Sequence, residues 1–431
     1  MVADSERLDI VLLGATGFTG KYCVPYLHQL AKEKGRNLTW GVSGRSENKL
    51  KNVLSEMGNK IGVDLSDVPI IPSDIKNDDS LLKMAKRAKV VINCCGPYRF
   101  LGEPVVKACI EAGANYVDVS AEPQFLESIQ LNYHKAAQEK GVYIVNACGF
   151  DCIPCDLGLI FIQDKFPGTL NSVVTYLDLW VEGKNIPGPL VNYGTWESVV
   201  YAIAHVYELS AIRKQLFPEK LPTFKPKVKP RIIPHRAEGG WAMPFFSADL
   251  GVMNRTQRYL YEHENKRPVQ VDTQGIFKSF FLMLATAFGL FFALLLVDFK
   301  FGRDWLLNYP HIFSWGTFRK DQYPSEEKTE KTVFQITLYA EGWDQKLTNR
   351  NDQYSNPPNK SIVARVKGRN PAYGTTCACL VGSAITIATE KNKLPQKGGV
   401  YTPGIAFGKT SLIELLNKNE VSFDILYQKD I

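Results

Sequence analysis

Short apolar runs recur through the first third of the chain. They cover residues 10–13, 38–42, 69–72, 90–95, 116–120 and 142–147, each four to six residues long. The segments between them are compatible with helices, and in the first of these Cys23, Tyr26, Leu27 and Leu30 follow helical spacing. Buried strands that alternate with helices are typical of a parallel sheet with helices on both faces. We therefore predict a doubly wound α/β domain over residues 1–157.

The pattern changes after the sixth run, where longer apolar runs predict an antiparallel sheet. They are residues 173–181, 332–341, 361–367 and 421–427. Helices are expected at 196–209 and 372–389, and the polar residues 349–360 are expected to form an exposed hairpin loop. These elements predict a second, α+β domain made of residues 158–275 and 319–431.

A third pattern interrupts this second domain. Residues 279–297 carry no charge, and at a rise of 1.5 Å per residue they span roughly 29 Å, the hydrocarbon thickness of a bilayer. Residues 299–318 mix aromatic and basic side chains, as segments at membrane interfaces do. We predict that residues 276–318 are a hydrophobic membrane-anchor hairpin that enters and leaves one leaflet, with residues 277–318 in contact with a lipid monolayer or membrane and residues 299–318 as the return limb. A buried core helix and a true membrane span are the alternatives.

Glycines mark the end of the first apolar run. They follow one another at three-residue intervals and precede a helix-compatible segment. Such a turn lets backbone amides approach a pyrophosphate, and the helix N-terminus adds the positive end of its dipole. This pattern indicates a Rossmann-type dinucleotide-binding domain, with a glycine-rich surface turn as the alternative. The residues expected to contact the cofactor here are Gly14, Thr16, Gly17, Phe18, Thr19 and Gly20.

The end of the second run discriminates between dinucleotides. NAD-binding proteins place an acid there for the ribose hydroxyls, whereas this chain has Ser43, Arg45 and Ser46, which suit a 2′-phosphate. NADP is therefore predicted in preference to NAD. Asp74, after the third run, is expected either to bond the adenine or to cap a helix.

Residues just past the later runs are candidates for the rest of the site, because ligands of such sheets bind at the carboxyl ends of strands. Cys95 and Gly96 are expected to border the cofactor. Hydride transfer also needs a group that supplies or removes a proton. The titratable candidates at strand ends are Tyr98, Asp118, Glu122 and Asp151, of which Tyr98, Asp118 and Glu122 are the predicted catalytic residues. Capping or orienting a loop is the alternative role for Asp118 and Asp151.

Positive charge is concentrated in one stretch. Residues 213–236 hold eight Lys or Arg against the single acid Glu219, a surplus equal to the net charge of +7 of the whole chain. Proline at every fourth residue from 218 to 234 excludes a regular helix there. An extended stretch is expected, which is either solvated or faces an anionic membrane surface or a phosphate-bearing ligand. No zinc-finger, basic-helix or RNP-like pattern accompanies it, which argues against nucleic acid as a partner.

Cysteine usage and the first residues bear on compartment and metal chemistry. Nine cysteines is an odd number, and the adjacent pair Cys94–Cys95 fits reduced thiols better than a disulfide framework. No metal site is predicted, because Cys148, Cys152 and Cys155 lie in apolar sequence without a nearby histidine. Residues 1–8 lack the apolar region of a secretory signal peptide, so a cytosolic start is expected.

Several sequence blocks, in order, resemble one family. GATGFTG, GRSENKL, INCCGPYRF and GFDCIPCDLG occur in the first domain, and GTWES, RTQRYLYE and GGVYTPG follow later. Together they resemble the saccharopine dehydrogenase-like oxidoreductases of animal cells over nearly the whole chain. The first domain is also similar to NADP-dependent saccharopine reductases and, more weakly, to bacterial trans-acting enoyl reductases of glycolipid synthesis. The chain departs from the family at Ala121, usually glycine, and at Cys152 and Cys155, often serine.

The resemblance implies an NADP-dependent oxidoreductase that transfers hydride to or from a lipid-related or membrane-delivered substrate. It further implies a place at the lipid droplet or the cytosolic face of a membrane, and a second domain that supplies the substrate pocket. A non-catalytic dinucleotide-binding droplet protein and a saccharopine-type amino acid dehydrogenase are the alternatives. A mitochondrial location and a homodimer are left open.

Overall fold

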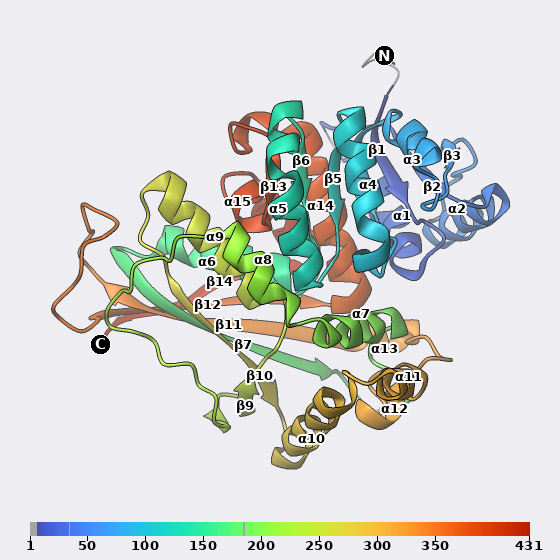
Figure 1. Cartoon of the computed structure of the whole chain (residues 1–431). Helices are drawn as coiled ribbons and strands as arrows, with labels where there is room; N and C mark the ends of the chain where they lie inside the picture. The colour runs from blue at the N-terminus through green and yellow to red at the C-terminus, as the bar shows by residue number, and fades with distance from the viewer. Residues whose placement is uncertain (1–6, 34, 184–185) are drawn as a thin grey trace. The chain divides into compact units, whose positions relative to one another are not determined.

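The computed structural model describes residues 7–33, 35–183 and 186–431. The chain folds into two compact units. The first unit comprises Met1–Phe150 and Tyr373–Asn419, and the second unit comprises Asp151–Ala372 and Glu420–Ile431. Figure 1 labels the elements of both.

The first unit is built on a seven-stranded sheet in the order β13-β6-β5-β4-β1-β2-β3, in which every pairing is parallel. Its strands are β1 (Leu8–Leu13), β2 (Trp40–Gly44), β3 (Ile70–Pro72), β4 (Ala88–Asn93), β5 (Asn115–Asp118), β6 (Tyr143–Val145) and β13 (Gly399–Tyr401). Its helices are α1 (Phe18–Ala31), α2 (Glu47–Ile61), α3 (Asp78–Ala85), α4 (Tyr98–Ala112), α5 (Pro123–Lys140), α14 (Thr376–Thr389), α15 (Pro403–Phe407) and α16 (Leu412–Asn417), with a 3-10 turn at Lys391–Lys393. The predicted doubly wound parallel sheet is confirmed.

The central strands of this sheet are buried on both faces. Ile10, Val11 and Leu12 in β1 have no exposed surface, and neither have Val90 and Val91 in β4. A strand covered on both faces needs a near-continuous apolar sequence rather than alternation. For this reason the short apolar runs located the strands.

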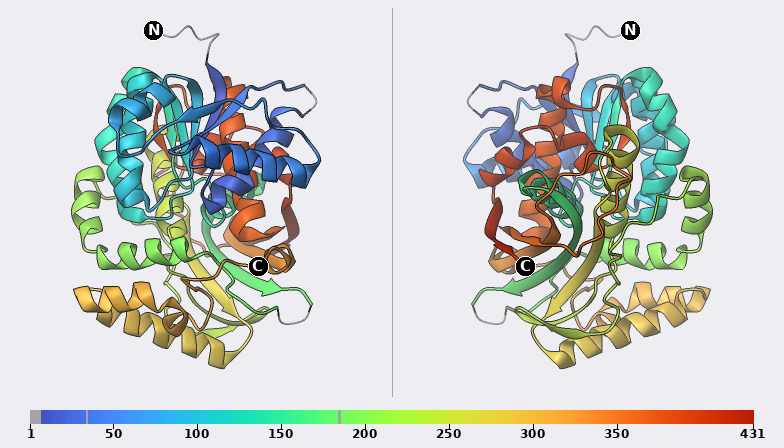
Figure 2. Two further views of the ribbon diagram at one scale, coloured as in Figure 1. Left: turned by 90° about the vertical axis from the view of Figure 1, so that its right-hand side faces the viewer. Right: turned by 90° about the vertical axis from the view of Figure 1, so that its left-hand side faces the viewer.

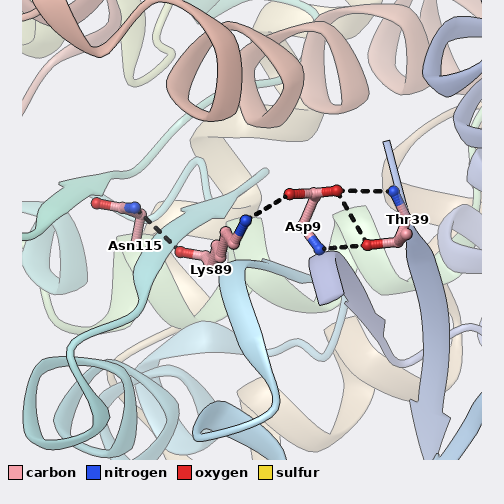
Figure 3. Close-up of polar contacts among 4 residues, drawn as sticks. All are labelled: Asp9, Thr39, Lys89 and Asn115. Carbon is pink, nitrogen blue, oxygen red and sulfur yellow. Dashed lines mark hydrogen bonds and ion pairs between the residues drawn. The ribbon is translucent and has the colours of Figure 1, made fainter. Parts of the chain in front are cut away.

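Polar contacts join the amino-terminal ends of neighbouring strands (Figure 3). The Asp9 carboxylate accepts hydrogen bonds from the Thr39 backbone N–H at 2.8 Å and hydroxyl at 2.9 Å, and it pairs with the Lys89 ammonium at 3.0 Å. The Asn115 amide donates to the Lys89 carbonyl at 3.0 Å. Burial raises the pKa of Asp9, but the bonds from Thr39 and Lys89 bring it below its ordinary value. This network joins β1, β2, β4 and β5 at the amino-terminal end of the sheet, opposite the glycine turn.

The carboxyl-terminal segment Tyr373–Asn419 lies in the first unit, whereas all of 319–431 was expected in the second domain. Its strand β13 extends the parallel sheet beside β6, and its helix α14 is buried from Thr376 to Ile387. A helix that is apolar on all sides belongs in a core, but its sequence does not say in which one. The stretch Pro371–Thr389 is the one helical segment of the described chain that is long and apolar enough to cross a membrane, and 83% of it is buried inside the protein.

The second unit holds a mixed seven-stranded sheet in the order β14-β12-β11-β7-β10-β9-β8. Its strands are β7 (Thr169–Val181), β8 (His235–Ala237), β9 (Gly240–Pro244), β10 (Gln270–Phe277), β11 (Thr332–Trp343), β12 (Lys360–Arg369) and β14 (Val421–Asp430). The predicted antiparallel pairing holds throughout except between β7 and β10, which are parallel. The predicted 349–360 loop lies in the β11–β12 hairpin connection, because Gly342 pairs with Lys360.

The helices of the second unit are α6 (Cys152–Lys165), α7 (Tyr193–Ala204), α8 (Glu208–Leu216), α9 (Asp249–Glu264), α10 (Phe280–Leu296), α11 (Lys300–Asn308), α12 (Pro310–Phe313) and α13 (Glu326–Lys331). A π-helical turn at Pro371–Thr375 spans the junction with the first unit. The single helix expected at 196–209 is two helices, α7 and α8. The connection between β7 and β10 contains α7, α8 and α9, which gives the long crossover that a parallel pair requires.

The hydrophobic segment forms the helical hairpin α10–α12, yellow to orange in Figures 1 and 2. Its first helix is not a core helix, because many of its large apolar side chains are exposed; Phe281 is 79% exposed and Phe291 54%. A narrow stripe that includes Met283, Gly289 and Ala293 is buried. The hairpin thus has an inner side packed on the second unit and an apolar outer side.

Candidate dinucleotide site

The order of strands in the first unit defines where a ligand can approach the sheet. From β1 the chain moves outward through β2 to β3, and it then returns to β4 on the other side of β1. The reversal between β1 and β4 is the topological switch point, where ligands of open α/β sheets bind at the carboxyl ends of the strands. Gly14 follows β1, and Cys94 to Gly96 follow β4.

The three glycines of the turn serve different purposes. Gly14 has φ +83°, and a Cβ on it would lie 2.6 Å from the Cys95 sulfur. A Cβ on Gly20 would lie 2.2 Å from the Gly14 carbonyl oxygen, so Gly20 lets α1 pack against the turn. A Cβ on Gly17 would meet only that same oxygen, at 3.2 Å. The fold itself therefore requires Gly14 and Gly20, whereas Gly17 leaves open space in front of the turn.

The start of α1 is suited to an anion. Its N-cap is Gly17, so no side chain caps the first turn. Thr16 and Gly17 are exposed, and Phe18 and Thr19 are half-buried. The Phe18 ring packs on Tyr373, with centroids 4.4 Å apart, which fixes the first turn of α1 against the carboxyl-terminal segment. The expected pyrophosphate cradle is thus an accessible helix N-terminus behind an uncrowded glycine.

The three residues expected at the 2′-phosphate differ in availability. Arg45 is exposed just past β2, and its charge reaches Cys95, whose pKa burial raises to about 12 against the lowering effect of Arg45. The Ser46 hydroxyl caps α2 by accepting from the Lys49 N–H at 3.4 Å. Ser43 is fully buried, and its hydroxyl has no hydrogen-bond partner among the described residues. Of the three side chains, Arg45 is thus the one that is exposed and able to reach a phosphate, and its contact with a 2′-phosphate stays a prediction.

Asp74 lies past β3 in a local turn. Its carboxylate accepts from the Lys76 N–H at 3.1 Å. The Ser80 hydroxyl accepts from the Asp74 backbone N–H and donates to the Asp74 carbonyl. The N-cap of α3 is Asn77, so the capping alternative for Asp74 was wrong. Its contact with adenine stays a prediction.

The side chains of Glu122 and Tyr98 both make hydrogen bonds to backbone groups around the start of α4. The two Glu122 carboxylate oxygens accept from the backbone N–H groups of Tyr98 at 2.9 Å and Arg99 at 2.8 Å, so this 3% exposed side chain caps the start of α4. The Tyr98 hydroxyl donates to the Asn93 carbonyl at 3.0 Å, and burial raises its pKa well above the ordinary value. In this arrangement both expected catalytic groups make structural bonds.

Asp118 is the centre of a buried polar network at the ends of β4, β5 and β6. One oxygen accepts from the Tyr116 hydroxyl at 2.8 Å and the Asn146 amide at 2.7 Å. The other accepts from the backbone N–H groups of Ser120 and Ala147, each at 3.0 Å. Burial raises the pKa of Asp118 to about 6, although each of these bonds lowers it.

The sequence analysis did not identify the residues that bond Asp118 or those that bond its partners. Asn93 is fully buried, its amide donates to the Tyr116 hydroxyl at 3.1 Å, and its side-chain oxygen accepts from the Cys95 N–H at 3.0 Å. A signal was present, because Asn93 and Asn146 are polar residues inside otherwise apolar runs, and buried polar groups are nearly always bonded. Tyr98, Asp118 and Cys94 also lie close enough to influence one another's charge. The structure thus gathers the predicted strand-end residues into polar networks, in which the Asn146 side-chain oxygen alone among the described partners of Asp118, Tyr116 and Asn93 is left without a hydrogen bond.

The second unit holds a separate group of titratable side chains. Asp151, with φ +84°, begins α6, and Asp249 begins α9. Burial and mutual repulsion raise the pKa of Asp151, and burial raises that of Asp249. The Cys155 thiol lies 3.4 Å from an Asp249 carboxylate oxygen. These buried groups join α6 to α9 in the core of the second unit.

Comparisons with known proteins place the chain in one family. Residues 10–145 match the family model described as the saccharopine dehydrogenase NADP binding domain. A human protein named saccharopine dehydrogenase-like oxidoreductase is 40% identical, with both chains covered completely. A Caenorhabditis elegans protein named lipid droplet localized protein is 36% identical over 98% of each chain.

A solved structure of apo saccharopine dehydrogenase (L-Glu forming) from Saccharomyces cerevisiae shares the fold, with a TM-score of 0.53 over 98% of this chain and 100% of that chain at 14% identity. The fold relation, the full-length identity and the matched cofactor domain point the same way. The dinucleotide of this domain is NADP. The chain therefore belongs to the family of saccharopine dehydrogenase-like, NADP-binding oxidoreductases.

Proposed function

We propose that this protein is an NADP-dependent oxidoreductase that transfers hydride to or from a lipid-related substrate, including glycolipids, at the surface of a lipid droplet. The observation that carries the proposal is the presence in one chain of an open dinucleotide turn and of an apolar helical hairpin. A small, multiply charged substrate such as saccharopine has no need of such a hairpin. The name of the Caenorhabditis elegans relative supports the droplet.

The dinucleotide, when bound, supplies or accepts the hydride. In this chain the first turn of α1, from Gly14 to Gly20, would hold its pyrophosphate, and Arg45 would hold its 2′-phosphate. Among the expected acid–base groups, Asp118 has a pKa of about 6, close to physiological pH. Catalysis by Tyr98, Asp118 or Glu122 would require that they exchange a structural bond for one to substrate.

The inner side of the α10–α12 hairpin is specifically packed. A Cβ on Gly289 would lie 2.4 Å from the Phe313 carbonyl oxygen, and a Cβ on Gly302 would lie 2.1 Å from the Leu296 carbonyl oxygen. The Trp315 indole donates to the Ala285 carbonyl at 2.9 Å. The hairpin is also fixed to α7 through a buried cluster of Trp196, Val200, Ala204, Ala293, Val297 and Leu306. Such close backbone approaches are typical of a tightly packed element of the fold.

The outer side of the same hairpin is apolar and exposed. The side chains at least 40% exposed are Phe280, Phe281, Leu282, Leu284, Phe288, Phe291, Phe292, Leu294, Leu295, Phe299, Phe301, Trp305, Tyr309, Ile312 and Trp315. A contiguous apolar surface of this size marks an interaction site. Interfacial helices bury such a face about 5–10 Å into the boundary between headgroups and acyl chains.

The packing of α10 suggests how it meets lipid. Its first residue, Phe280, packs on Trp241 of β9, with ring centroids 4.9 Å apart, and its end packs on α7 and α11. The buried stripe of Met283, Gly289 and Ala293 lies between these two ends, so one side of the helix is packed from its start to its end. We infer an anchor that lies in the plane of the monolayer, rather than two limbs that enter and leave it. A transmembrane span does not fit a droplet monolayer, whereas a helix that lies in the plane of the monolayer does.

The activity is tested by lipid and metabolite mass spectrometry of cells that lack the protein. Rescue is compared between the parent chain, a cofactor-blind Gly17→Val variant, and a Phe281→Ser/Phe288→Ser/Phe291→Ser variant of the outer side. We expect one lipid class to change on deletion, to be restored by the parent chain and to be restored by neither variant. Rescue by Gly17→Val would contradict turnover, and accumulation of saccharopine alone would favour an amino acid dehydrogenase.

A non-catalytic droplet protein is the second candidate function. It is favoured by the fact that the Glu122 carboxylate and the Tyr98 hydroxyl are engaged in structural bonds. Under this proposal the dinucleotide is a structural ligand. NADPH should then raise the thermal midpoint of the protein without being consumed in any lipid extract, whereas an oxidoreductase should consume it.

A further inference from the structure

The second unit carries a basic segment beside the hairpin. We call residues 227–236, which read KVKPRIIPHR, the basic strap; it contains Lys227, Lys229, Arg231 and Arg236 and no acid. Its last two residues, His235 and Arg236, belong to β8, which pairs with β9. The strap is therefore part of the sheet edge that also supports the start of α10.

The strap is held by side chains of β10 rather than left as a solvated loop. The Val228 N–H donates to the Gln270 side-chain oxygen at 3.0 Å, and the Arg231 N–H donates to Asp272 at 3.3 Å. The Gln274 amide donates to the Arg231 carbonyl at 3.2 Å. These contacts fix an extended backbone whose remaining side chains face outward.

Much of the positive charge of the strap is unneutralised. Lys227 and Lys229 are exposed, and among the described residues neither forms an ion pair. Arg231 turns inward and donates to the Tyr176 hydroxyl at 2.6 Å. Arg236 lies 4.7 Å over the Trp241 ring, and that ring contacts Phe280 of α10. A continuous series of contacts thus runs from a strap cation to the apolar hairpin.

Two large apolar side chains lie between these cations. Ile232 is 73% exposed and Ile233 is 74% exposed. An exposed isoleucine pair bordered by lysine and arginine is the composition of a segment that inserts between anionic headgroups: apolar side chains enter the acyl region, and cations remain at the phosphates. Soluble acidic partners would give the isoleucines no apolar environment.

We propose that the basic strap is a second lipid contact, which makes the protein select surfaces rich in anionic phospholipid. The proposal rests on the proposed function in one respect, that α10 faces the same lipid surface. The hairpin supplies the apolar attachment, which is indifferent to headgroup charge. The strap supplies the charge selectivity, because cations near an anionic surface gain binding free energy individually.

Vesicle flotation with the full-length protein tests the proposal, on phosphatidylcholine vesicles with and without about 30% phosphatidylserine. The variants are Lys227→Gln/Lys229→Gln/Arg236→Gln and Ile232→Ser/Ile233→Ser. The matched control, Lys83→Gln/Lys86→Gln/Lys140→Gln, removes the same charge from exposed positions in the first unit. NADPH affinity and the thermal midpoint of each variant report whether it is folded.

We expect phosphatidylserine to raise binding of the parent protein and of the control, and the strap charge variant to lose roughly 100-fold, about fivefold per cation. That variant should bind neutral vesicles as the parent does, and 0.5 M salt should remove the parent's preference. The isoleucine variant should bind anionic vesicles severalfold more weakly.

Equal binding of the parent protein to neutral and anionic vesicles would overturn the strap proposal and leave the hairpin proposal intact. Binding to anionic vesicles only, abolished by the charge variant, would support the strap and contradict the hairpin. Heparin binding as tight as that to anionic vesicles, with no effect of the isoleucine change, would assign the strap to a soluble polyanion and overturn the lipid contact.

Discussion

Gly17 and Gly20 stand three residues apart in the same turn, yet their environments differ. Because a Cβ on Gly20 would overlap the Gly14 carbonyl at 2.2 Å, Gly20→Ala should destabilise the first unit by about 1–3 kcal/mol. Gly17→Ala meets that oxygen at 3.2 Å and should leave stability nearly unchanged while weakening NADPH binding at least about tenfold. Thermal unfolding without cofactor, together with fluorescence titration of NADPH, measures both effects. Equal losses of stability in the two variants would contradict this division of roles.

At the residue scale, we predict that Arg45 carries the preference for NADP. Arg45→Asp should lower NADPH affinity by about 10- to 100-fold, because a charge-assisted bond of roughly 1.5–3 kcal/mol is lost and repulsion is added. NADH affinity should change little. Arg87→Asp, which alters an exposed arginine at the other end of the sheet, is the control. Titration of NADPH and NADH against the parent protein and both variants measures these affinities. Equal affinities of the parent protein for NADPH and NADH would contradict the assignment.

Asp118 makes stability depend on pH in a defined direction. Its pKa is about 6 in the folded protein against 3.8 for the ordinary carboxyl, so the folded state holds this proton more tightly. Such a group contributes stability that is present at low pH and is lost as pH rises through about 6. Relative to Asp118→Asn, the parent protein should therefore lose about 2 kcal/mol of unfolding free energy between pH 4.5 and 7.5.

Urea unfolding of the parent protein and of Asp118→Asn at both pH values provides the measurement. Taking the difference between the two proteins removes the contribution of other carboxylates, including Asp9, whose lowered pKa acts in the opposite direction. An advantage of the parent protein that grows with pH would show that Asp118 is stabilised in its charged form.

At the element scale, the two sides of α10 should respond differently to substitution. Gly289→Ala places a Cβ against the Phe313 carbonyl and should cost about 1–3 kcal/mol of stability by forcing α10 away from α12. Phe288→Ala, at a side chain 52% exposed, should cost much less stability but should weaken attachment to droplets. Thermal unfolding and droplet fractionation separate the two. Strong destabilisation by Phe288→Ala would show that its surface is covered in the folded protein.

Elements also differ in how well their own sequence predicts their position in the fold. The runs of β1 and β4 are apolar because both faces are buried, so their type and their position along the chain could be predicted, whereas the order of the strands in the sheet came from the structure. The last helix, α14, is apolar on every side, so its sequence indicates burial but not the partner. The three residues of β13 are too few for a periodic signal.

At the scale of the whole molecule, the division of the chain predicts which fragments fold. Residues 1–150 contain the matched family domain but lack β13 and α14, which complete the first unit. This fragment should be insoluble or should unfold without cooperativity. Residues 1–150 linked to 373–419 should fold and bind NADPH, as circular dichroism and titration would show. Full NADPH affinity of residues 1–150 alone would contradict this division.

The sequence by itself determined the local parts of this protein: the glycine turn, the positions of the parallel strands along the chain and the hydrophobic hairpin segment. Each depends on residues close together in the chain, where backbone sterics and apolar periodicity act. Only the tertiary structure decided that Tyr373–Asn419 completes the first unit, that Glu122 caps α4, and that Asp118 is bonded by Tyr116 and Asn146. These outcomes depend on contacts between distant segments, and a buried polar residue shows only that it needs a partner, not which one.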